Sequence, residues 1–374
     1  MSDLAERLEA TFFDTFLPLI LDSGDESLQC YLRNDNARWW QGYLNKPLLF
    51  LPPPPKIKDV PEAKPIRLGR VIKRLATCYR QDLEGKVTLA NTVLETLFAA
   101  TDRLAVAFSG GRDSLVALHL ARQIKPDIPV MIVNTSIEFP ESLEYVRRLA
   151  VEWGLNFHEV KPSVNFWNLA NEQGLPVAGR GNTTFMKDLA EQANVKLSNS
   201  CCRRMKETPA RQFYREHHTE GVITGLRVNE SLMRKLNFAD YGALRYSSTY
   251  NTLVSWPLYA WKEQDISDYI ERRQLPLNPL YSMGYGRVGC WACMQDMFYK
   301  DSRLFTLQQQ HPKLYATVQK KFGSQMIRLL TAWASLEDYD FQEEDLDALY
   351  RACMFELLDD YRKAKAERKD QSDV

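Results

Sequence analysis

The sequence lacks several features that mark common classes of protein. It carries no net charge, because 48 basic residues balance 48 acidic ones. This balance argues against a general electrostatic nucleic-acid binder, although a local basic groove remains compatible with it. The sequence also has no internal repeats, no apolar run long enough to cross a bilayer, and no basic N-terminal segment followed by an apolar one. We therefore expect a cytoplasmic protein with no membrane partner, whose oligomeric state is left open.

Cysteine is scarce, at seven of 374 residues, which excludes a disulfide framework in a chain of this length. In a reducing compartment, closely paired cysteines more often indicate metal or redox chemistry. Four of the cysteines form two close pairs, whereas Cys30, Cys78 and Cys353 stand alone. The pairs, which are candidate ligands of one metal centre, are Cys201-Cys202 and Cys290-Trp291-Ala292-Cys293.

The length and the 45% hydrophobic content suit one large domain with an appendage, or two domains. Four consecutive prolines in residues 51–56 exclude a helix and favour an extended linker. We therefore predict an N-terminal accessory segment over residues 1–85, which contains this linker. A main domain would follow over residues 86–300, and a helical C-terminal region over residues 301–374.

Short apolar runs alternate with amphipathic segments through the predicted main domain, which is typical of a doubly wound, mostly parallel, Rossmann-like α/β sheet. The expected strands are Leu104–Phe108, Val130–Asn134, Asn156–Val160 and Gly221–Thr224. The expected helices are Leu89–Ala99, Ser114–Ile124, Pro140–Trp153 and Lys262–Arg272.

A glycine turn lies between the first of these strands and the helix after it, where an α/β sheet places its ligands. Two glycines let the backbone approach an anion, and the helix N-terminus favours phosphate. Asp113 would cap the helix or hold Mg²⁺, and the alternative for the whole segment is an ordinary strand–helix turn. It is neither a Walker A loop nor a dinucleotide fingerprint. The full hexapeptide is Ser109-Gly110-Gly111-Arg112-Asp113-Ser114.

A second candidate group follows the strand at 221–224. Gly225 ends that strand at the ligand edge, and Arg227 is close enough in sequence to reach a phosphate with its planar fork. The structural alternative for Arg227 is an ion pair with Glu230.

The four paired cysteines suit tetrahedral zinc, an iron–sulfur cluster or buried thiols. Directly adjacent ligands such as Cys201 and Cys202 fit one small ion poorly, whereas a cluster offers them separate irons. Arg203, Arg204 and Lys206 would stabilise the negative charge of a cluster, or they would simply form a solvent-facing basic turn.

The hexapeptide resembles the PP-loop of ATP pyrophosphatases, enzymes that cleave ATP between the α and β phosphates and share the adenine nucleotide α-hydrolase-like fold. Within that superfamily the chain looks most like the adenylyl-sulfate and phosphoadenylyl-sulfate (APS/PAPS) reductase branch. The likeness covers roughly Leu89 to Met294. It rests on Val133-Asn134-Thr135, Glu138-Phe139-Pro140-Glu141-Ser142, Gly225-Leu226-Arg227 with Glu230, Ser231 and Arg234, Trp256-Pro257-Leu258, Leu275–Tyr281 and Gly289-Cys290.

This resemblance implies an enzyme with ATP, Mg²⁺ and a [4Fe–4S] cluster. Members with a cluster bind it through an adjacent cysteine pair and a Cys-x-x-Cys pair, here Cys201, Cys202, Cys290 and Cys293. Lys206 matches a lysine near that cluster. The implied catalytic residues are Asp113, Arg227 and Lys206, and the nucleotide would be bound by Ser109, Gly110, Gly111, Arg112, Asp113, Ser114, Gly225 and Arg227.

The sequence departs from the reductases in one respect: it has no ECG-x-H-like motif to supply the attacking cysteine, and Cys353 lies at helical spacing among apolar residues. The functional type it then most resembles is the ATP pyrophosphatase of DNA phosphorothioation (DndC-like or SspD-like), with a cysteine desulfurase, DNA and other DNA-modification subunits as partners. One alternative is a sulfonucleotide reductase with a non-standard nucleophile. Another is a non-catalytic nucleotide-binding or redox-sensing subunit, and the sulfur acceptor could also be tRNA or a small molecule.

Overall fold

The structure is a computed structural model that describes residues 78–177, 184–198, 200–230, 242–247, 249–295 and 303–335, together with Arg234 and Phe238. Most of the predicted accessory segment, its proline linker, Cys30 and Cys353 lie outside the described residues. The predicted domain boundaries at 85 and 300 therefore stay predictions. No helix in the described ranges is long and apolar enough to cross a membrane.

The described chain forms two compact units, each built from three separate stretches of sequence. The first unit takes residues 78–132, Glu144–Val160 and Ala210–Asn278. The second takes Val133–Leu143, Lys161–Pro209 and residues 279–335. Each unit has its own buried apolar cluster.

The first unit contains a six-stranded sheet in the order β3-β2-β1-β6-β8-β7. β1 pairs in parallel with both β2 and β6, β6 pairs in parallel with β8, and β7 closes one edge in antiparallel orientation. The fold is therefore the predicted doubly wound, mostly parallel α/β sheet. The strands are β1 (Leu104–Ala107), β2 (Pro129–Val133), β3 (Asn156–Val160), β6 (Gly221–Thr224), β7 (Leu244–Ser247) and β8 (Thr252–Ser255).

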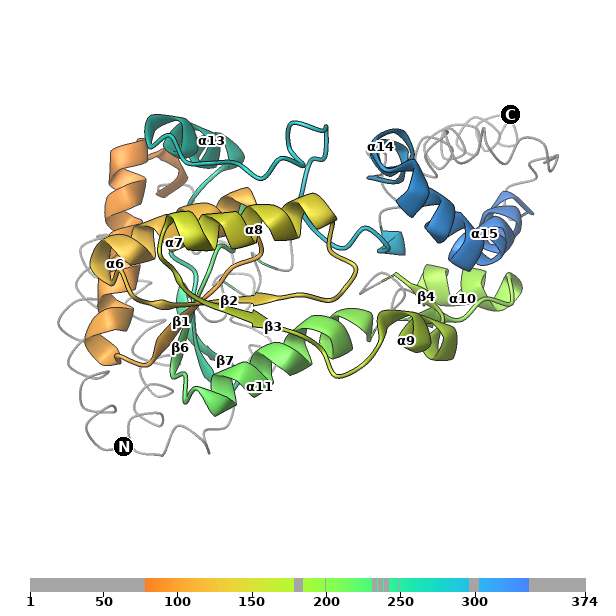
Figure 1. Cartoon of the computed structure of the whole chain (residues 1–374), viewed down its shortest axis with the longest axis horizontal. Helices are drawn as coiled ribbons and strands as arrows, with labels where there is room; N and C mark the ends of the chain where they lie inside the picture. The colour runs from red at the N-terminus through yellow and green to blue at the C-terminus, as the bar shows by residue number, and fades with distance from the viewer. Residues whose placement is uncertain are drawn as a thin grey trace, which may run out of the picture. The chain divides into compact units, whose positions relative to one another are not determined.

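Helices cover both faces of this sheet, with α7 and α8 above it and α11 below it in Figure 1. The helices are α6 (Leu83–Ala100), α7 (Arg112–Ile124), α8 (Pro140–Glu152), α11 (Thr208–Glu216) and α13 (Glu263–Arg272). A short 3-10 turn at Val228–Glu230 follows β6. Layers on both faces explain why the central strands are continuous apolar runs, since both of their sides are buried.

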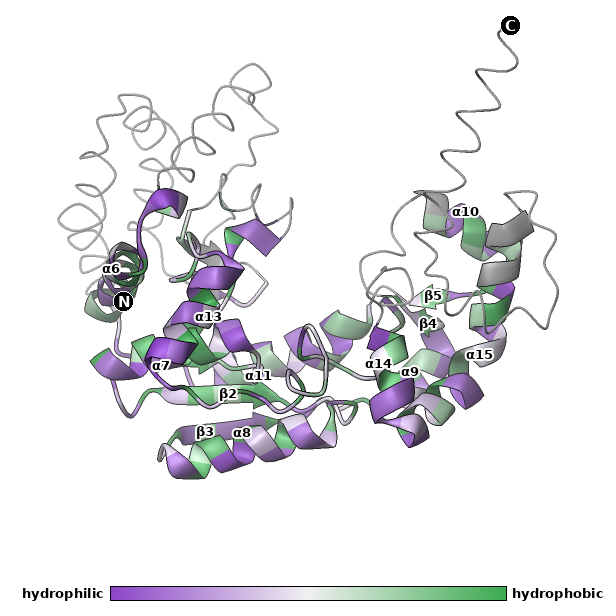
Figure 2. Ribbon diagram, turned by 90° about the horizontal axis from the view of Figure 1, so that it is seen from above, coloured by the Kyte–Doolittle hydropathy of each residue, from purple (hydrophilic) through white to green (hydrophobic). Residues whose placement is uncertain are grey.

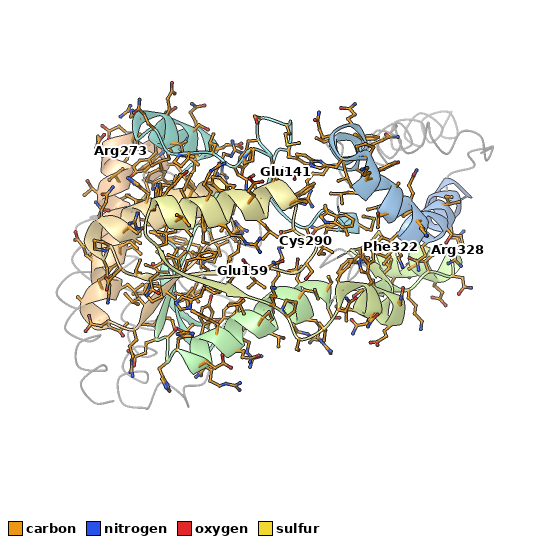
Figure 3. The ribbon with its side chains drawn as sticks, in the orientation of Figure 1. Glu141, Glu159, Arg273, Cys290, Phe322 and Arg328 are labelled. Carbon is orange, nitrogen blue, oxygen red and sulfur yellow. The ribbon has the colours of Figure 1, made fainter. Side chains whose placement is uncertain are left out.

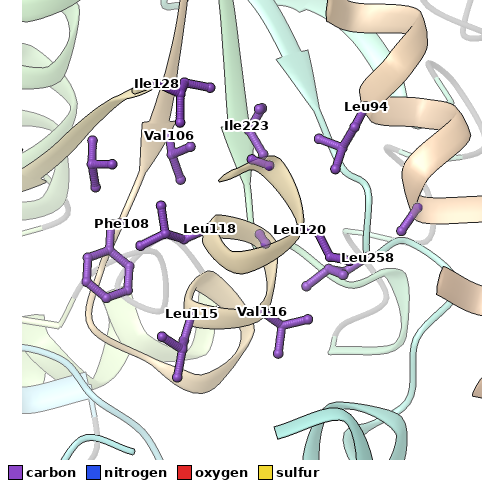
Figure 4. Close-up of a cluster of buried hydrophobic side chains, with 14 of the residues drawn as sticks. Leu94, Val106, Phe108, Leu115, Val116, Leu118, Leu120, Ile128, Ile223 and Leu258 are labelled. Atoms are coloured by element: carbon purple, nitrogen blue, oxygen red, sulfur yellow. The ribbon is translucent and has the colours of Figure 1, made fainter. Parts of the chain in front are cut away.

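The core of the first unit lies where α7 packs on the central strands (Figure 4). Val106 on β1, Ile223 on β6 and Leu118 on α7 are fully buried. A buried cation adds a specific contact, because Lys86 on α6 lies with its Nζ 2.5 Å from Oδ2 of Asp265 on α13. Removing one member of such a pair leaves an uncompensated charge, so the pair holds α6 to α13 specifically.

The second unit is mainly helical around a core of its own. Phe166, Leu189 and Phe322, from three different helices, are buried in this core. Its elements are α9 (Phe166–Gln173), α10 (Thr184–Gln192), the π-helical turn η7 (Arg203–Glu207), α14 (Arg303–Gln310) and α15 (Pro312–Ser335), with a two-stranded parallel sheet of β4 (Leu175–Pro176) and β5 (Leu197–Ser198).

Candidate functional site

The glycine turn follows β1 at the point where the strand order of the sheet reverses, since β2 and β6 flank β1 on opposite sides. This is the position at which open α/β sheets bind ligands. Gly110 has a φ of 76°, a conformation that residues with a side chain rarely adopt. Gly111, not Asp113, is the N-cap of α7, and no side chain caps the helix there. The capping interpretation of Asp113 is therefore wrong, and the N-terminal end of α7 is left with no capping side chain.

Two serines brace the turn from inside. The Oγ atoms of Ser109 and Ser114 lie 3.0 Å apart, and the Ser114 hydroxyl donates to the Gly111 carbonyl at 2.9 Å. The Ser109 amide also donates to Ser114 Oγ at 3.3 Å. Both predicted phosphate-binding hydroxyls therefore hold the shape of the turn.

Gly225 lets the end of β6 pass very close to the start of α7. A Cβ atom at this position would lie 2.5 Å from the carbonyl carbon of Asp113 and 2.5 Å from the amide nitrogen of Ser114. Both are backbone atoms that cannot rotate away. Gly225, which the sequence placed at the ligand edge of the sheet, must therefore be glycine because the main chain at the end of β6 contacts the main chain of the glycine turn.

Arg227 is buried and pairs with Asp113, its Nε lying 2.7 Å from Asp113 Oδ1. Its guanidinium is also 3.9 Å from Glu230, which has a closer partner in Arg234. The ion pair between Arg227 and Glu230 that the sequence offered as an alternative is therefore present, but it is longer than the contact between Arg227 and Asp113. Burial raises the pKa of Asp113, and the charge of Arg227 acts against that rise.

Arg112 extends from the turn to the α13 side. Its Nη2 lies 2.7 Å from Glu263 Oε1, and the Glu263 side chain is 66% exposed. Exposed ion pairs are worth little, so this contact would give way easily to a bound anion.

Asn278 is a site residue that the sequence did not single out as more than a turn former. It is 1% exposed, and its side-chain amide donates to the Gly110 carbonyl at 3.2 Å. It thereby supports the turn from a position 168 residues away in the chain. In the sequence, Asn278 was marked by the Asn278-Pro279 turn signal and by its place in the Leu275–Tyr281 segment that resembles the reductases.

The four paired cysteines all belong to the second unit. Cys201, Cys290 and Cys293 are partly buried and Cys202 is exposed, and none of the four forms a disulfide with another described residue. Burial and the neighbouring thiols Cys202, Cys290 and Cys293 raise the pKa of Cys201 to about 12. The Cys201-Cys202 pair and the Cys290–Cys293 pair, which are distant in sequence, are therefore near enough for the thiols of one pair to shift the pKa of a thiol in the other. Cys290 is labelled in Figure 3.

Lys206, on the π-helical turn after the first pair, faces Cys290 and Glu138. Its Nζ lies 3.4 Å from Glu138 Oε1. Burial lowers the pKa of Lys206, but the charges of Cys290 and Glu138 outweigh it, so the net shift is upward. Arg203 and Arg204 are exposed, as the alternative of a solvent-facing basic turn predicts for them.

Glu138 and Thr135 complete this group, and the sequence assigned them no role. Glu138 is 8% exposed, accepts a hydrogen bond from the Thr135 hydroxyl at 2.9 Å, and accepts from the Cys290 thiol at 3.5 Å. The backbone of Glu138 also forms a bridge with Cys290. The only sequence signal for these residues was their place in the segment that resembles the reductases.

Among the described residues, no three His, Cys, Asp or Glu side chains converge on a point that could hold one metal ion. A tetrahedral zinc would draw its thiolates to about 2.3 Å from one centre. The donor set itself, four cysteine sulfurs with an ammonium group beside them, fits an iron–sulfur centre in chemistry. A compact single-ion site is not formed in this part of the chain.

An open hollow of about 400 Å³ lies along α10 and β5, lined by residues between Lys187 and Leu197. None of the predicted site residues lines it.

Known proteins resemble parts of this chain. An uncharacterised protein from Methanocaldococcus jannaschii is 26% identical over 291 residues, which cover 75% of this chain and 64% of that protein. Adenosine 5'-phosphosulfate reductase 1 from Bacillus subtilis is 26% identical over 198 residues, covering 53% of this chain and 76% of the reductase. The crystal structure of phosphoadenylyl-sulfate reductase from Candida auris matches with a TM-score of 0.41 at 20% identity, covering 54% of this chain and 88% of that one.

The chain spans less than two thirds of the length of the Methanocaldococcus relative and 39% of a second uncharacterised protein from that organism. The sequence pattern of the phosphoadenosine phosphosulfate reductase domain matches residues 103–296, which include the glycine turn, Arg227 and all four paired cysteines. The chain belongs to the phosphoadenosine phosphosulfate reductase domain family.

Proposed function

We propose that this protein is an iron–sulfur ATP pyrophosphatase that activates an acceptor oxygen for sulfur insertion, with the DNA backbone phosphate as acceptor. The observation that carries the proposal is the combination of a braced glycine turn at the switch point of the sheet with four neighbouring thiols. Among the described residues, the one cysteine outside that set is Cys78, which is buried. A reductase would need a further accessible thiol as nucleophile.

The glycine turn would bind the triphosphate. The amides at the start of α7 would bind the anion, and the positive end of the helix would stabilise it. Asp113 would hold Mg²⁺, which is usually bound in proteins through one or two carboxylates and the substrate phosphates. Arg227 would stabilise charge on the phosphates, for which its contact with Asp113 keeps it oriented.

The paired cysteines Cys201, Cys202, Cys290 and Cys293 would hold a [4Fe–4S] cluster, which when bound supplies electron transfer or sulfur chemistry. Lys206 would balance the negative charge of the four thiolates, and Glu138 would keep the ammonium group of Lys206 directed at Cys290. The sulfur would come from a cysteine desulfurase, and other DNA-modification subunits would present the DNA. These partners rest on the resemblance, and a cytoplasmic location rests on the sequence features described above; both stay predictions.

The test is a product analysis with anaerobically reconstituted protein, reducing agent, Mg²⁺ and ATP labelled at the α phosphate. The proposal expects AMP and pyrophosphate, and no labelled ADP. Asp113→Asn should abolish both products, whereas Asp102→Asn, an exposed carboxylate outside the turn, serves as the matched control. Absence of pyrophosphate from a protein that holds its full iron content would contradict the proposal.

The second candidate is a sulfonucleotide reductase, favoured by the family and by the named activities of the relatives. It expects sulfite from adenylyl sulfate and a reductant. If Cys353→Ser abolishes sulfite release, Cys353 supplies the missing nucleophile. Turnover of neither nucleotide would favour the third alternative, a nucleotide-binding or redox-sensing subunit.

A further inference from the structure

Helix α15 has two opposite faces. Its buried residues recur at intervals of three and four, which places them on one apolar stripe. The exposed positions lie on the other side of the helix. Figure 2 shows hydrophilic and hydrophobic residues alternating along α15, and Figure 3 labels one residue of each kind, Arg328 and Phe322. The buried stripe is Tyr315, Val318, Phe322, Met326 and Leu329.

The exposed face of α15 is basic and contains no acid. Lys313, Lys320 and Arg328 are exposed and lie seven and eight residues apart, within roughly 80° of arc around the helix axis. Lys321 borders this face, with its ammonium group 5.7 Å from the centre of the Trp167 ring. No carboxylate occurs between residues 303 and 335, and no ion pair joins these four cations to another described residue. We name Lys313, Lys320, Lys321 and Arg328 the α15 basic face.

The charge of this helix is not balanced within its own unit. The described residues of the second unit include twelve Lys or Arg and six Asp or Glu, although the whole chain is neutral. A uniformly positive face on a positive unit attracts a polyanion over a long range.

We propose that the α15 basic face binds the phosphate backbone of double-stranded DNA. The inference deepens the proposed function, and the choice of DNA among phosphate backbones rests on that function. The exposed residues between the cations are Ala316, Gln319 and Ser324, which are small or neutral and leave room for a backbone to approach. Contacts of this kind position a protein on a duplex and are independent of base sequence.

Other polyanionic partners fit the face less well. Single-stranded nucleic acids are bound by aromatic side chains that stack on bases. The aromatic residues of α15 between residues 312 and 329, Tyr315 and Phe322, are buried. An anionic membrane surface calls for exposed apolar residues beside the cations. The exposed positions of this face include no large apolar residue.

The length of the face sets the expected size of the effect. From Lys313 to Arg328 the helix rises about 22 Å, along which a duplex presents roughly 13 phosphate charges. The four cations, not the DNA, therefore limit the number of contacts. With up to four contacts, the slope of log K against log salt should lie at about −3 to −4.

The experiment measures binding of the full chain to a fluorescein-labelled 20-base-pair duplex by anisotropy, between about 0.05 and 0.3 M NaCl and without ATP. The variant is Lys313→Gln/Lys320→Gln/Arg328→Gln. The matched control, Lys161→Gln/Arg211→Gln/Arg215→Gln, removes the same charge from exposed positions elsewhere. The proposal expects the variant to lose about 2.7 from the slope and on the order of a hundredfold in affinity at 0.1 M salt, and the control to keep the wild-type slope.

Equal losses in both variants would overturn the proposal by assigning the effect to net charge, and no loss in the first variant would place binding elsewhere. Should the triple variant fail to fold, Lys320→Gln alone must reduce the slope by about 0.9. The sequence from 337 to 360 holds ten acidic residues and one arginine. Binding that emerges only after these acids are neutralised would assign the face to that segment and overturn DNA as its partner. Because pyrophosphate release is measured separately, failure of the docking proposal and failure of the proposed function are distinguishable.

Discussion

Replacing Gly225 by alanine tests the contact that joins the two parts of the nucleotide site. The added Cβ would lie 2.5 Å from two backbone atoms of the glycine turn, about 1 Å closer than ordinary van der Waals contact allows. Neither side can relieve this contact by a side-chain rotation. Either β6 or the start of α7 must therefore move by roughly 1 Å, at a cost of about 1–3 kcal/mol, which is typical of overpacking.

The shift would also displace the amides that are proposed to bind phosphate. Misplacement by about 1 Å can reduce the rate of a reaction by about 100-fold. We therefore expect Gly225→Ala to melt several degrees below the wild-type protein and to bind ATP, or adenylyl sulfate, at least tenfold more weakly. Differential scanning calorimetry gives the first quantity and isothermal titration calorimetry the second.

Gly323→Ala is the matched control, because its added Cβ meets no atom within 4 Å and it lies inside α15. Its higher helix propensity should stabilise that helix by about 0.5–1 kcal/mol without changing nucleotide affinity. If Gly225→Ala and Gly323→Ala behave alike in both measurements, the close passage of β6 over the turn is not what requires glycine at 225.

Four further predictions concern other contacts. Lys86→Met leaves Asp265 without its ammonium partner and should lower the free energy of unfolding by about 3 kcal/mol in urea denaturation. Asn278→Ala removes the hydrogen bond to the turn and should cost about 1–2 kcal/mol, with weaker ATP binding in calorimetry. If the proposed [4Fe–4S] cluster is present, Glu138→Gln should leave the iron content intact and raise the reduction potential of the cluster in a titration followed by electron paramagnetic resonance, because it removes a buried negative charge. Burial and two arginines lower the pKa of His119, so the folded state binds fewer protons than the unfolded one, and stability should fall as pH drops below about 6.5; His119→Gln should flatten this dependence in urea melts at pH 5 and 7.5.

The sheet was predictable because local pattern and tertiary environment agree in it. The expected strands at 156–160 and 221–224 were found with the same bounds, and the other two lie within one residue of prediction. The antiparallel β7–β8 pair was missed. Its strands have four residues each, and a tight turn with Asn251 at a φ of 54° joins them. So short a pair depends on the neighbouring β6 for its stability.

The site was less predictable than the sheet because its partners are distant in sequence. The glycine turn could be predicted because its residues are adjacent in the chain, and it lies between β1 and α7 as expected. The contacts of Asn278 with Gly110 and of Glu138 with Cys290 join residues more than 150 positions apart. Local hydrophobic periodicity carries no information about such contacts. A single sequence therefore indicates which residues could take part in catalysis or binding, but it does not indicate which of them lie in contact.

The neutral total charge conceals a local concentration of positive charge on α15. Zero net charge argues against a general nucleic-acid binder only if the charges are mixed along the chain. In this sequence they are segregated, with no acid between 303 and 335 and ten acids against one base between 337 and 360. Because Debye screening at physiological salt acts over about 8 Å, a phosphate backbone responds to the nearest residues and not to the total. The α15 basic face should therefore bind DNA with a salt dependence set by its own cations, even in a protein of zero net charge.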